Sequence, residues 1–371
     1  MMKPMQIYWL WFAILALMGC TFLPASNATE QPIVPIPRPV SLTPAMSVRV
    51  DVAGAVAWLD FCQALYQGQP WDEAAVRQMM ASPPYQVLVA HHSQMDSEVT
   101  SEALVKLLLA LRDDRPWSSP SERLNRIYTA YHSACGQFTT LRKKLELVQG
   151  SLSLKKALSC AQEALPPQAR VEATVYLLAD GRSTGYVVGK CIVLDLLQVS
   201  NSAEIEATLA HELHHIGASS LLPAPCPDTY LRAALEILTD LVQEGAATYW
   251  IDNQRFSATQ ADYIQIEAFL RDVLSERLGA EEIASRRQGL VQGAYGPLYQ
   301  VGNEMIAALA SAYGEDWVQA HLGDPVGLFR TWEEKRKTSS ILSQEVLSLL
   351  DDALEGCPEW RTKLENGWVQ Q

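Results

Sequence analysis

Residues 201–217 read NSAEIEATLAHELHHIG and predict an amphipathic helix. Asn201 can cap its first turn, with Glu204 three residues later as in a capping box. At about 100° per residue, His211 and His215 lie one turn apart on one face, where two imidazoles can bind a single metal ion. Glu212 lies at the flank of this pair, within reach of a water on that ion. The alternative is an ordinary helix whose histidines bind nothing.

A second helix is predicted from about Tyr230 to Ile251, and it carries Glu244. Gly217 and the proline-rich segment 223–227 form a loop that can reverse the chain between the two helices. Two antiparallel helices would then bring Glu244 opposite the histidine pair. A catalytic zinc ion takes three protein ligands and leaves a fourth position for water. Glu244 is therefore the candidate third ligand, and the alternative is an exposed helical glutamate.

The remaining sequence predicts an α+β fold that is predominantly α-helical. Helical periodicity runs from about residue 46 to 165 and predicts an N-terminal helical region. Residues Val175–Leu178 and Tyr186–Leu196 are rich in β-formers and are separated by turn residues, which predicts a hairpin. Helical periodicity then returns and continues to the C-terminus. Residues 166–371 are expected to form a second region that contains this small sheet.

The N-terminus has the pattern of an export signal. Residues 7–18 form an unbroken apolar run of twelve residues, which suits a signal peptide and is short for a membrane span. The run ends at Cys20 in a sequence that resembles a bacterial lipobox, which implies a signal peptide over 1–19 and a lipidated cysteine. The alternative is ordinary secretory cleavage after Ala25 or Ala28. The expected location is the cell envelope, with the chain anchored to a membrane.

The segment that follows is expected to be a spacer. Residues 20–45 contain six prolines, which favour extended polyproline II structure over packing. Thr21 follows the cysteine. Where the residue at this position determines how a lipoprotein is sorted, Thr21 resembles the signal for the outer membrane. Six further cysteines allow fifteen pairings, and free thiols are equally consistent with the sequence, so no disulfide is predicted.

Composition limits the class of protein. The 371 residues are 48% hydrophobic and 19% charged, enough for one large domain or two ordinary ones with real cores. The formal net charge is −13, whereas nucleic-acid binding needs clustered Lys and Arg to neutralise phosphates. No nucleic-acid partner is therefore expected.

The two helix motifs resemble those of a known enzyme group. H-E-x-x-H at 211–215, followed by E-G-x-A at 244–247, resembles the gluzincin branch of zinc metallopeptidases. The wider pattern resembles a bacterial family of zinc-dependent peptidases. The similar stretch runs from about Val175 through the hairpin and both motifs to residues 296–302, about half of the chain. This resemblance implies a zincin-like catalytic domain within 166–371.

The resemblance also implies roles for individual residues. His211, His215 and Glu244 would bind Zn²⁺, and Glu212 would be the general base that takes a proton from water and delivers it to the leaving amine. Two histidines and one carboxylate also suit other transition metals, so the sequence does not determine which metal ion is bound.

Two further roles lie outside these motifs: the hydrogen-bond donor to the developing oxyanion, and the carboxylate that supports a ligand histidine. Tyr299, in the segment Gly-Pro-Leu-Tyr, is the candidate donor, with Tyr295 and His321 as alternatives. Better-known gluzincins often place an Asp one turn after the glutamate ligand, where this chain has Thr248. Asp240, one turn before Glu244, is the candidate substitute.

A peptide or protein substrate is the expected partner. In related folds an edge strand before the motif helix binds the peptide, and Tyr186–Leu196 occupies that place. The alternative is a non-catalytic lipoprotein that keeps zinc for stability or recognition. Glu212 favours catalysis, because it is superfluous for holding the metal but is needed to activate water.

The other histidines are expected to be structural or solvent-facing. His214 projects about 80° from the middle of the ligand pair and is expected to be solvated or to support the site from outside the ligand set. The adjacent His91 and His92 cannot both face one way on a regular element, and His132 lies beside a helical stripe.

Overall fold

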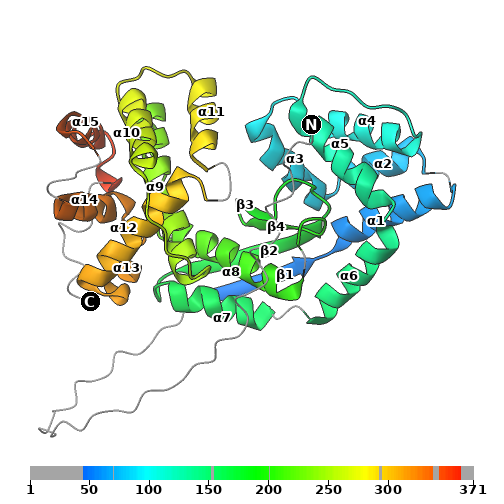
Figure 1. Cartoon of the computed structure of the whole chain (residues 1–371), viewed down its shortest axis with the longest axis horizontal. Helices are drawn as coiled ribbons and strands as arrows, with labels where there is room; N and C mark the ends of the chain where they lie inside the picture. Colours follow the sequence, from blue (N-terminus) through cyan, green and yellow to red (C-terminus); the bar gives the residue numbers. More distant parts are fainter. Residues whose placement is uncertain are drawn as a thin grey trace, which may run out of the picture. The chain divides into compact units, whose positions relative to one another are not determined.

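The computed structural model describes residues 45–69, 71–151, 154–199, 201–291, 295–336 and 342–360. The predicted signal peptide, Cys20 and all but the last residue of the predicted spacer lie outside these ranges. Within them, fifteen α-helices accompany one four-stranded sheet (Figure 1), so the predicted helical α+β fold is confirmed. Across the same ranges, every helix is too short or too polar to cross a bilayer.

The sheet has the strand order β1-β2-β4-β3. β2 (Arg170–Leu178) pairs in parallel with β1 (Ala45–Asp51) on one side and with β4 (Cys191–Asp195) on the other. β3 (Gly185–Val188) pairs antiparallel with β4 and forms an edge of the sheet. The central strands β2 and β4 both end in runs of consecutive buried residues, as expected for strands covered on both faces.

Two predictions about this sheet are wrong. Residues 45–51 form β1, although helical structure was expected from residue 46, and their regular alternation of exposed and partly buried side chains suits an edge strand. The stretch Tyr186–Leu196 is not one strand, because a two-residue turn that starts at Gly189, with φ 59°, divides it into β3 and β4. The hairpin is therefore β3–β4, and of these two strands only β3 is an edge of the sheet.

Seven helices lie between β1 and β2, in the region predicted to be helical. The α1 helix packs against β2, and α3 packs against β2 and β4, so this group covers part of the sheet. The helices are α1 (Ala53–Tyr66), α2 (Glu73–Met80), α3 (Pro83–Met95), α4 (Ser101–Arg112), α5 (Glu122–Cys135), α6 (Phe138–Ser151) and α7 (Leu154–Ala164).

The helices after the sheet carry the predicted site. The α8 helix contacts β2, β3 and β4, and it also contacts α9, which packs along α12. The helices are α8 (Ser202–Ser219), α9 (Thr229–Trp250), α10 (Gln260–Leu274), α11 (Ala280–Val291), α12 (Pro297–Tyr313), α13 (Glu315–Ala320), α14 (Pro325–Arg336) and α15 (Gln344–Leu354), followed by a short 3₁₀ turn at Pro358–Trp360.

Two disulfide bonds join distant parts of the chain, although the sequence predicted no pairing. Cys62 on α1 is bonded to Cys135 on α5. Cys226, in the loop between α8 and α9, is bonded to Cys357 near the last described residues. Cys160 and Cys191 are free thiols. The second bond fixes the loop that separates the two helices with the predicted metal ligands.

Candidate metal centre

The α8 helix is capped and anchored as its sequence predicts. The Asn201 side chain accepts a hydrogen bond of 3.0 Å from the backbone amide of Glu204. Ile205, Leu209 and Leu213 are fully buried, and they belong to the core that the helix forms with the sheet. This burial fixes the rotation of α8 about its axis, and therefore the direction in which its histidines point.

Three side chains come together on α8 and α9. His211, His215 and Glu244 each contribute one donor atom, and these atoms lie within 4.8 Å of one another. Oε2 of Glu244 is 3.3 Å from Nε2 of His211 and 3.3 Å from Nε2 of His215. A tetrahedral zinc ion with bonds of about 2.0–2.1 Å separates its ligand atoms by about 3.3–3.4 Å. The donor types, and the distance of Glu244 from each imidazole, therefore fit a zinc ion.

Asp252 supports the first of these histidines. Its carboxylate oxygens lie 3.1 and 3.3 Å from Nδ1 of His211, so the ring can donate from Nδ1 and keep the lone pair of Nε2 for a metal. Burial favours the neutral ring, but hydrogen bonds to Asp252 and Glu244 raise the pKa of His211 well above its usual value. Asp252 was not predicted from the sequence, because the candidate positions for a supporting carboxylate were those one turn from Glu244. Asp252 lies about two helical turns after Glu244, just past the end of α9.

Opposing effects set the protonation of the two glutamates. Burial raises the pKa of Glu212, although the charges of His215 and His211 oppose this effect. Glu212 is only 9% exposed to solvent. Burial also disfavours ionised Glu244, but the charge of His215 and hydrogen bonds from both imidazoles hold its pKa below its usual range. Glu244 is thus kept as the carboxylate that a metal requires, while Glu212 is a more basic group beside it.

Close contact between α9 and α12 brings Tyr299 to the site. A Cβ atom added to Gly245 would lie 2.3 Å from the backbone of Gly302, so only glycine allows the two helices to meet here. Burial, the charges of Glu244 and Glu212 and a hydrogen bond to Glu244 raise the pKa of Tyr299. The Tyr299 hydroxyl therefore stays protonated at neutral pH and can donate a hydrogen bond.

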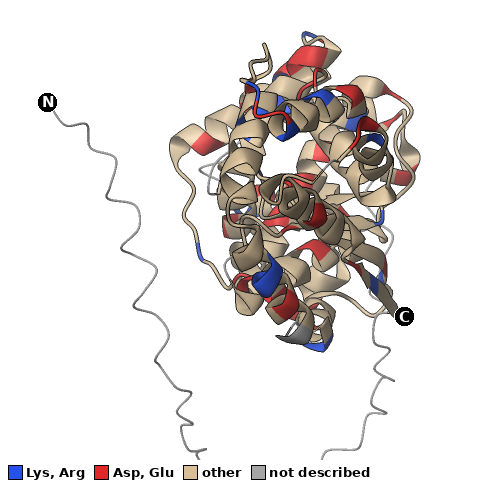
Figure 2. Cartoon of the chain, turned by 90° about the vertical axis from the view of Figure 1, so that its right-hand side faces the viewer, with Lys and Arg blue, Asp and Glu red and all other residues tan. Residues whose placement is uncertain are grey.

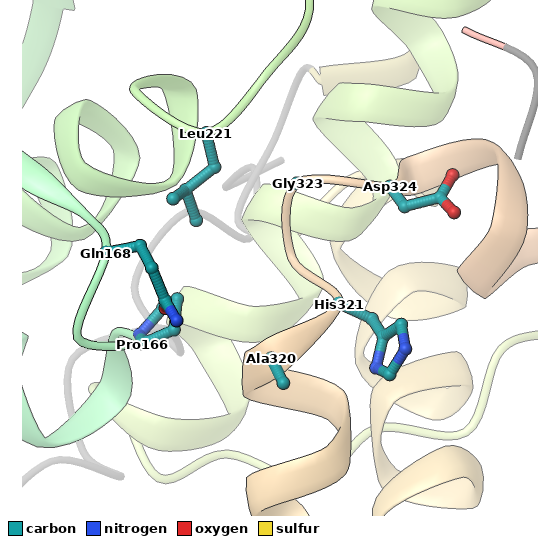
Figure 3. Close-up of a pocket in the computed structure, with 7 residues that line it drawn as sticks. All are labelled: Pro166, Gln168, Leu221, Ala320, His321, Gly323 and Asp324. Atoms are coloured by element: carbon teal, nitrogen blue, oxygen red, sulfur yellow. The ribbon is translucent and has the colours of Figure 1, made fainter. Parts of the chain in front are cut away.

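The two alternatives to Tyr299 have different positions. Tyr295 packs edge-on against Tyr299, with ring centroids 5.9 Å apart, and is partly exposed at the margin of the site. His321 lines a separate small pocket with Pro166 and Leu221 (Figure 3). Its ring donates from Nδ1 to the carbonyl oxygen of Trp317 at 2.7 Å, and it does not join the three donors.

The prediction for Asp240 is wrong, and for His214 the solvated alternative is wrong. Asp240 does not support a metal ligand, because its carboxylate binds the guanidinium of Arg287 on α11 at 2.7 Å. His214 is fully buried rather than solvated, and both of its ring nitrogens lack a hydrogen-bond partner within the described part of the chain. Burial therefore lowers the pKa of His214 well below its usual value. Thr248, where an Asp was considered, is also fully buried.

The histidine pair on α3 is structural, and neither ring faces solvent. His92 is fully buried, with Nε2 2.9 Å from Oδ2 of Asp180. The His91 ring stacks on Tyr186 at a centroid distance of 3.6 Å. His132 is exposed and lies beside Tyr128 on α5.

Comparison with known proteins agrees with this geometry. Searches for similar curated proteins and for similar solved structures find no match. Residues 76–339, more than half of the chain, match one family, and this range contains all three donors together with Glu212, Tyr299 and Asp252. The chain therefore belongs to the family described as "Putative zinc dependent peptidase (DUF5700)".

Proposed function

We propose that this protein is a gluzincin-like zinc hydrolase that cleaves peptide bonds, with Glu212 as its general base. The observation that carries this proposal is the set of three donor atoms, in which Glu244 lies at zinc-ligand distance from both imidazoles, with the buried carboxyl group of Glu212 beside them. A structural zinc site is normally closed by a fourth protein ligand. Three protein donors and an adjacent base are instead typical of a catalytic site.

Each residue has a chemical task in this reaction. A bound zinc ion would supply a Lewis acid that polarises a carbonyl group and makes water more acidic. Glu212 accepts the proton of the attacking water, which its raised pKa favours, and then delivers that proton to the leaving amine. Tyr299 donates a hydrogen bond to the developing oxyanion, because its hydroxyl stays protonated. Asp252 orients the ring of His211.

The substrate would pair with β3. This strand is an edge of the sheet, so its outer backbone groups have no strand partner in the sheet order. Gly185, at the start of β3, lies against Thr208 of α8, one turn before His211. An extended peptide added to this edge would therefore run past the metal centre.

The test is a Glu212→Gln variant of the zinc-loaded protein, assayed on a peptide library. We expect one zinc per chain, as in the unaltered protein, and a loss of turnover of at least about 100-fold, the usual contribution of a general base. Glu206→Gln is the matched control, because Glu206 lies on the same helix and pairs with Lys156. Full activity in Glu212→Gln would reject the mechanism. No cleavage by the unaltered protein, with zinc still bound, would favour a binding lipoprotein.

We also propose that the mature protein is exported and lipid-anchored at Cys20. Two disulfide bonds suit an oxidising compartment, since such bonds are rare in the cytosol. The experiment compares Cys20→Ser with the unaltered chain by membrane fractionation and by the mass of the N-terminal peptide. Loss of the diacyl mass and release from the membrane are expected. A mature N-terminus beyond residue 25 would show ordinary secretion instead.

A further inference from the structure

A cleft that contains none of the metal donors is lined by three arginines. It has a volume of about 620 Å³ and lies between the end of α3, the α5 helix, the loop that precedes β3, and α11. Arg123 and Arg126 come from α5, and Arg182 comes from the loop before β3. The chain as a whole has a formal charge of −13, and Figure 2 shows acidic positions on many of its helices. A concentration of arginines in one cleft of such a chain is therefore unusual.

The carboxylates that line this cleft leave Arg182 unpaired. Glu122 forms an ion pair with Arg126 on the same helix. Asp96 accepts hydrogen bonds from the Ser121 hydroxyl and from the backbone amide of Glu98. Within the described ranges, the Arg182 guanidinium has no carboxylate partner, and its Nε is buried without a hydrogen-bond acceptor. A buried donor without an acceptor is costly, so this group is suited to an anionic ligand.

A buried network holds Arg123 and the loop in place. An Arg123 nitrogen donates to Nδ1 of His92 at 2.9 Å, so the Nε2 proton of His92 is directed to Asp180. The hydroxyl of Tyr186, on β3, donates to the same Asp180 oxygen at 2.9 Å. Burial and, after it, the nearby charge of Arg182 lower the pKa of Arg123, although the charges of Asp180 and Asp96 oppose this effect. The two guanidinium groups are therefore preorganised and repel each other until an anion binds.

This cleft lies at one end of the proposed substrate strand. Arg182 is three residues before Gly185, so their Cα atoms are at most about 11 Å apart. Gly185 in turn contacts α8 at Thr208, one turn before His211. The wall that carries Arg182 therefore adjoins the strand whose first residue lies against the helix that bears the histidines.

We propose that Arg123 and Arg182 bind a carboxylate of the peptide substrate on the C-terminal side of the cleaved bond. This proposal rests on the proposed peptidase function. A peptide antiparallel to β3 directs its C-terminal end towards the start of that strand, where Arg182 lies. A parallel peptide would bring its N-terminal ammonium group to the arginines, which would repel it. The carboxylate can be the chain terminus or an acidic side chain near it.

The experiment measures binding without turnover. The zinc-loaded Glu212→Gln protein is titrated with a fluorescein-labelled pentapeptide of alanines, in three forms: a free carboxyl terminus, an amidated terminus, and an amidated terminus with glutamate at the last residue. We expect the free acid or the glutamate form to bind about 10- to 100-fold more tightly than the neutral amide, the range for charge-assisted hydrogen bonds. The form that gains this affinity identifies the source of the carboxylate.

Arginine variants then test the cleft itself. Arg182→Gln should abolish the preference for a carboxylate, and Arg182→Lys should retain part of it, because the charge remains without the planar fork. Arg49→Gln is the matched control, since Arg49 lies on β1 at the other edge of the sheet. Absence of a preference in the parent protein, or its survival in both Arg182→Gln and Arg123→Gln, would overturn the proposal.

The same peptides separate this proposal from the proposed function. Cleavage by the unaltered protein without any carboxylate preference would reject the arginine site and keep the hydrolase. A preference that depends on Arg182, in a protein that cleaves no peptide, would support the site and reject hydrolysis. Thermal melting of each variant checks that it is folded. If Arg182→Gln does not fold, a partial loss of the preference in Arg182→Lys and a loss in Arg123→Gln are the expected results.

Discussion

A single methyl group at Gly245 should separate the two helices that hold Glu244 and Tyr299. In Gly245→Ala the new Cβ would lie 2.3 Å from the carbonyl carbon of Gly302 and 2.4 Å from its oxygen. Both are backbone atoms and cannot rotate away. Restoring ordinary contact, at about 3.4–4.0 Å between heavy atoms, requires α9 and α12 to move apart by about 1 Å.

The size of the effect follows from two opposing contributions. Alanine is favoured over glycine in a helix interior by about 1 kcal/mol. Forcing an extra carbon into a packed contact costs about 1–3 kcal/mol, and the upper end applies here because both sides of the contact are backbone. We expect a net loss of about 1–2 kcal/mol in the free energy of unfolding. Zinc affinity should also fall, because metal sites tolerate ligand displacements of only about 0.2 Å.

Urea unfolding and zinc competition with a chelator measure these two quantities. Gly289→Ala is the matched control, because Gly289 also lies inside a helix, α11, and a Cβ there would meet no atom within 4 Å. The control should be slightly stabilised and should bind zinc normally. If Gly245→Ala is as stable as the control and keeps its zinc affinity, the helix contact does not position Glu244.

Three further predictions concern the groups around the donors. Asp252→Asn should weaken zinc binding by about 10- to 100-fold through the loss of its bond to His211, measured by chelator competition, whereas Asp240→Asn should not. In the metal-free protein the pKa values of His211 and His215 are raised, so protons compete with the metal. Zinc affinity should therefore be weaker at pH 6 than at pH 8, and a flat profile would contradict this expectation. Tyr299→Phe should lower kcat by roughly 100-fold and leave the zinc content unchanged, and equal loss of both would indicate a structural role.

Local sequence pattern is enough to predict the helices that bear the donors. The cap at Asn201 and the i, i+4 spacing of His211 and His215 depend only on helix geometry, and the structure agrees with both. In each case the physical cause lies within a few residues of the chain.

The predictions that were wrong depend on partners far away in the sequence. β1 pairs with β2, whose residues follow about 125 positions later, and no local signal identifies such a partner. Asp240 is drawn away from the metal centre by Arg287 on another helix. Asp252 reaches His211 only because of how α8 and α9 are oriented, which helix periodicity does not specify. The burial of His214 likewise results from tertiary packing.

The bond between Cys226 and Cys357 has a consequence for proteolysis of this protein. The two cysteines are separated by 131 positions, and the interval contains Glu244, Asp252 and Tyr299. A protease that cut a loop within this interval would produce two fragments still held together by one covalent bond. The fragments would separate on a gel only after reduction, and the nicked molecule could keep its donor groups in place.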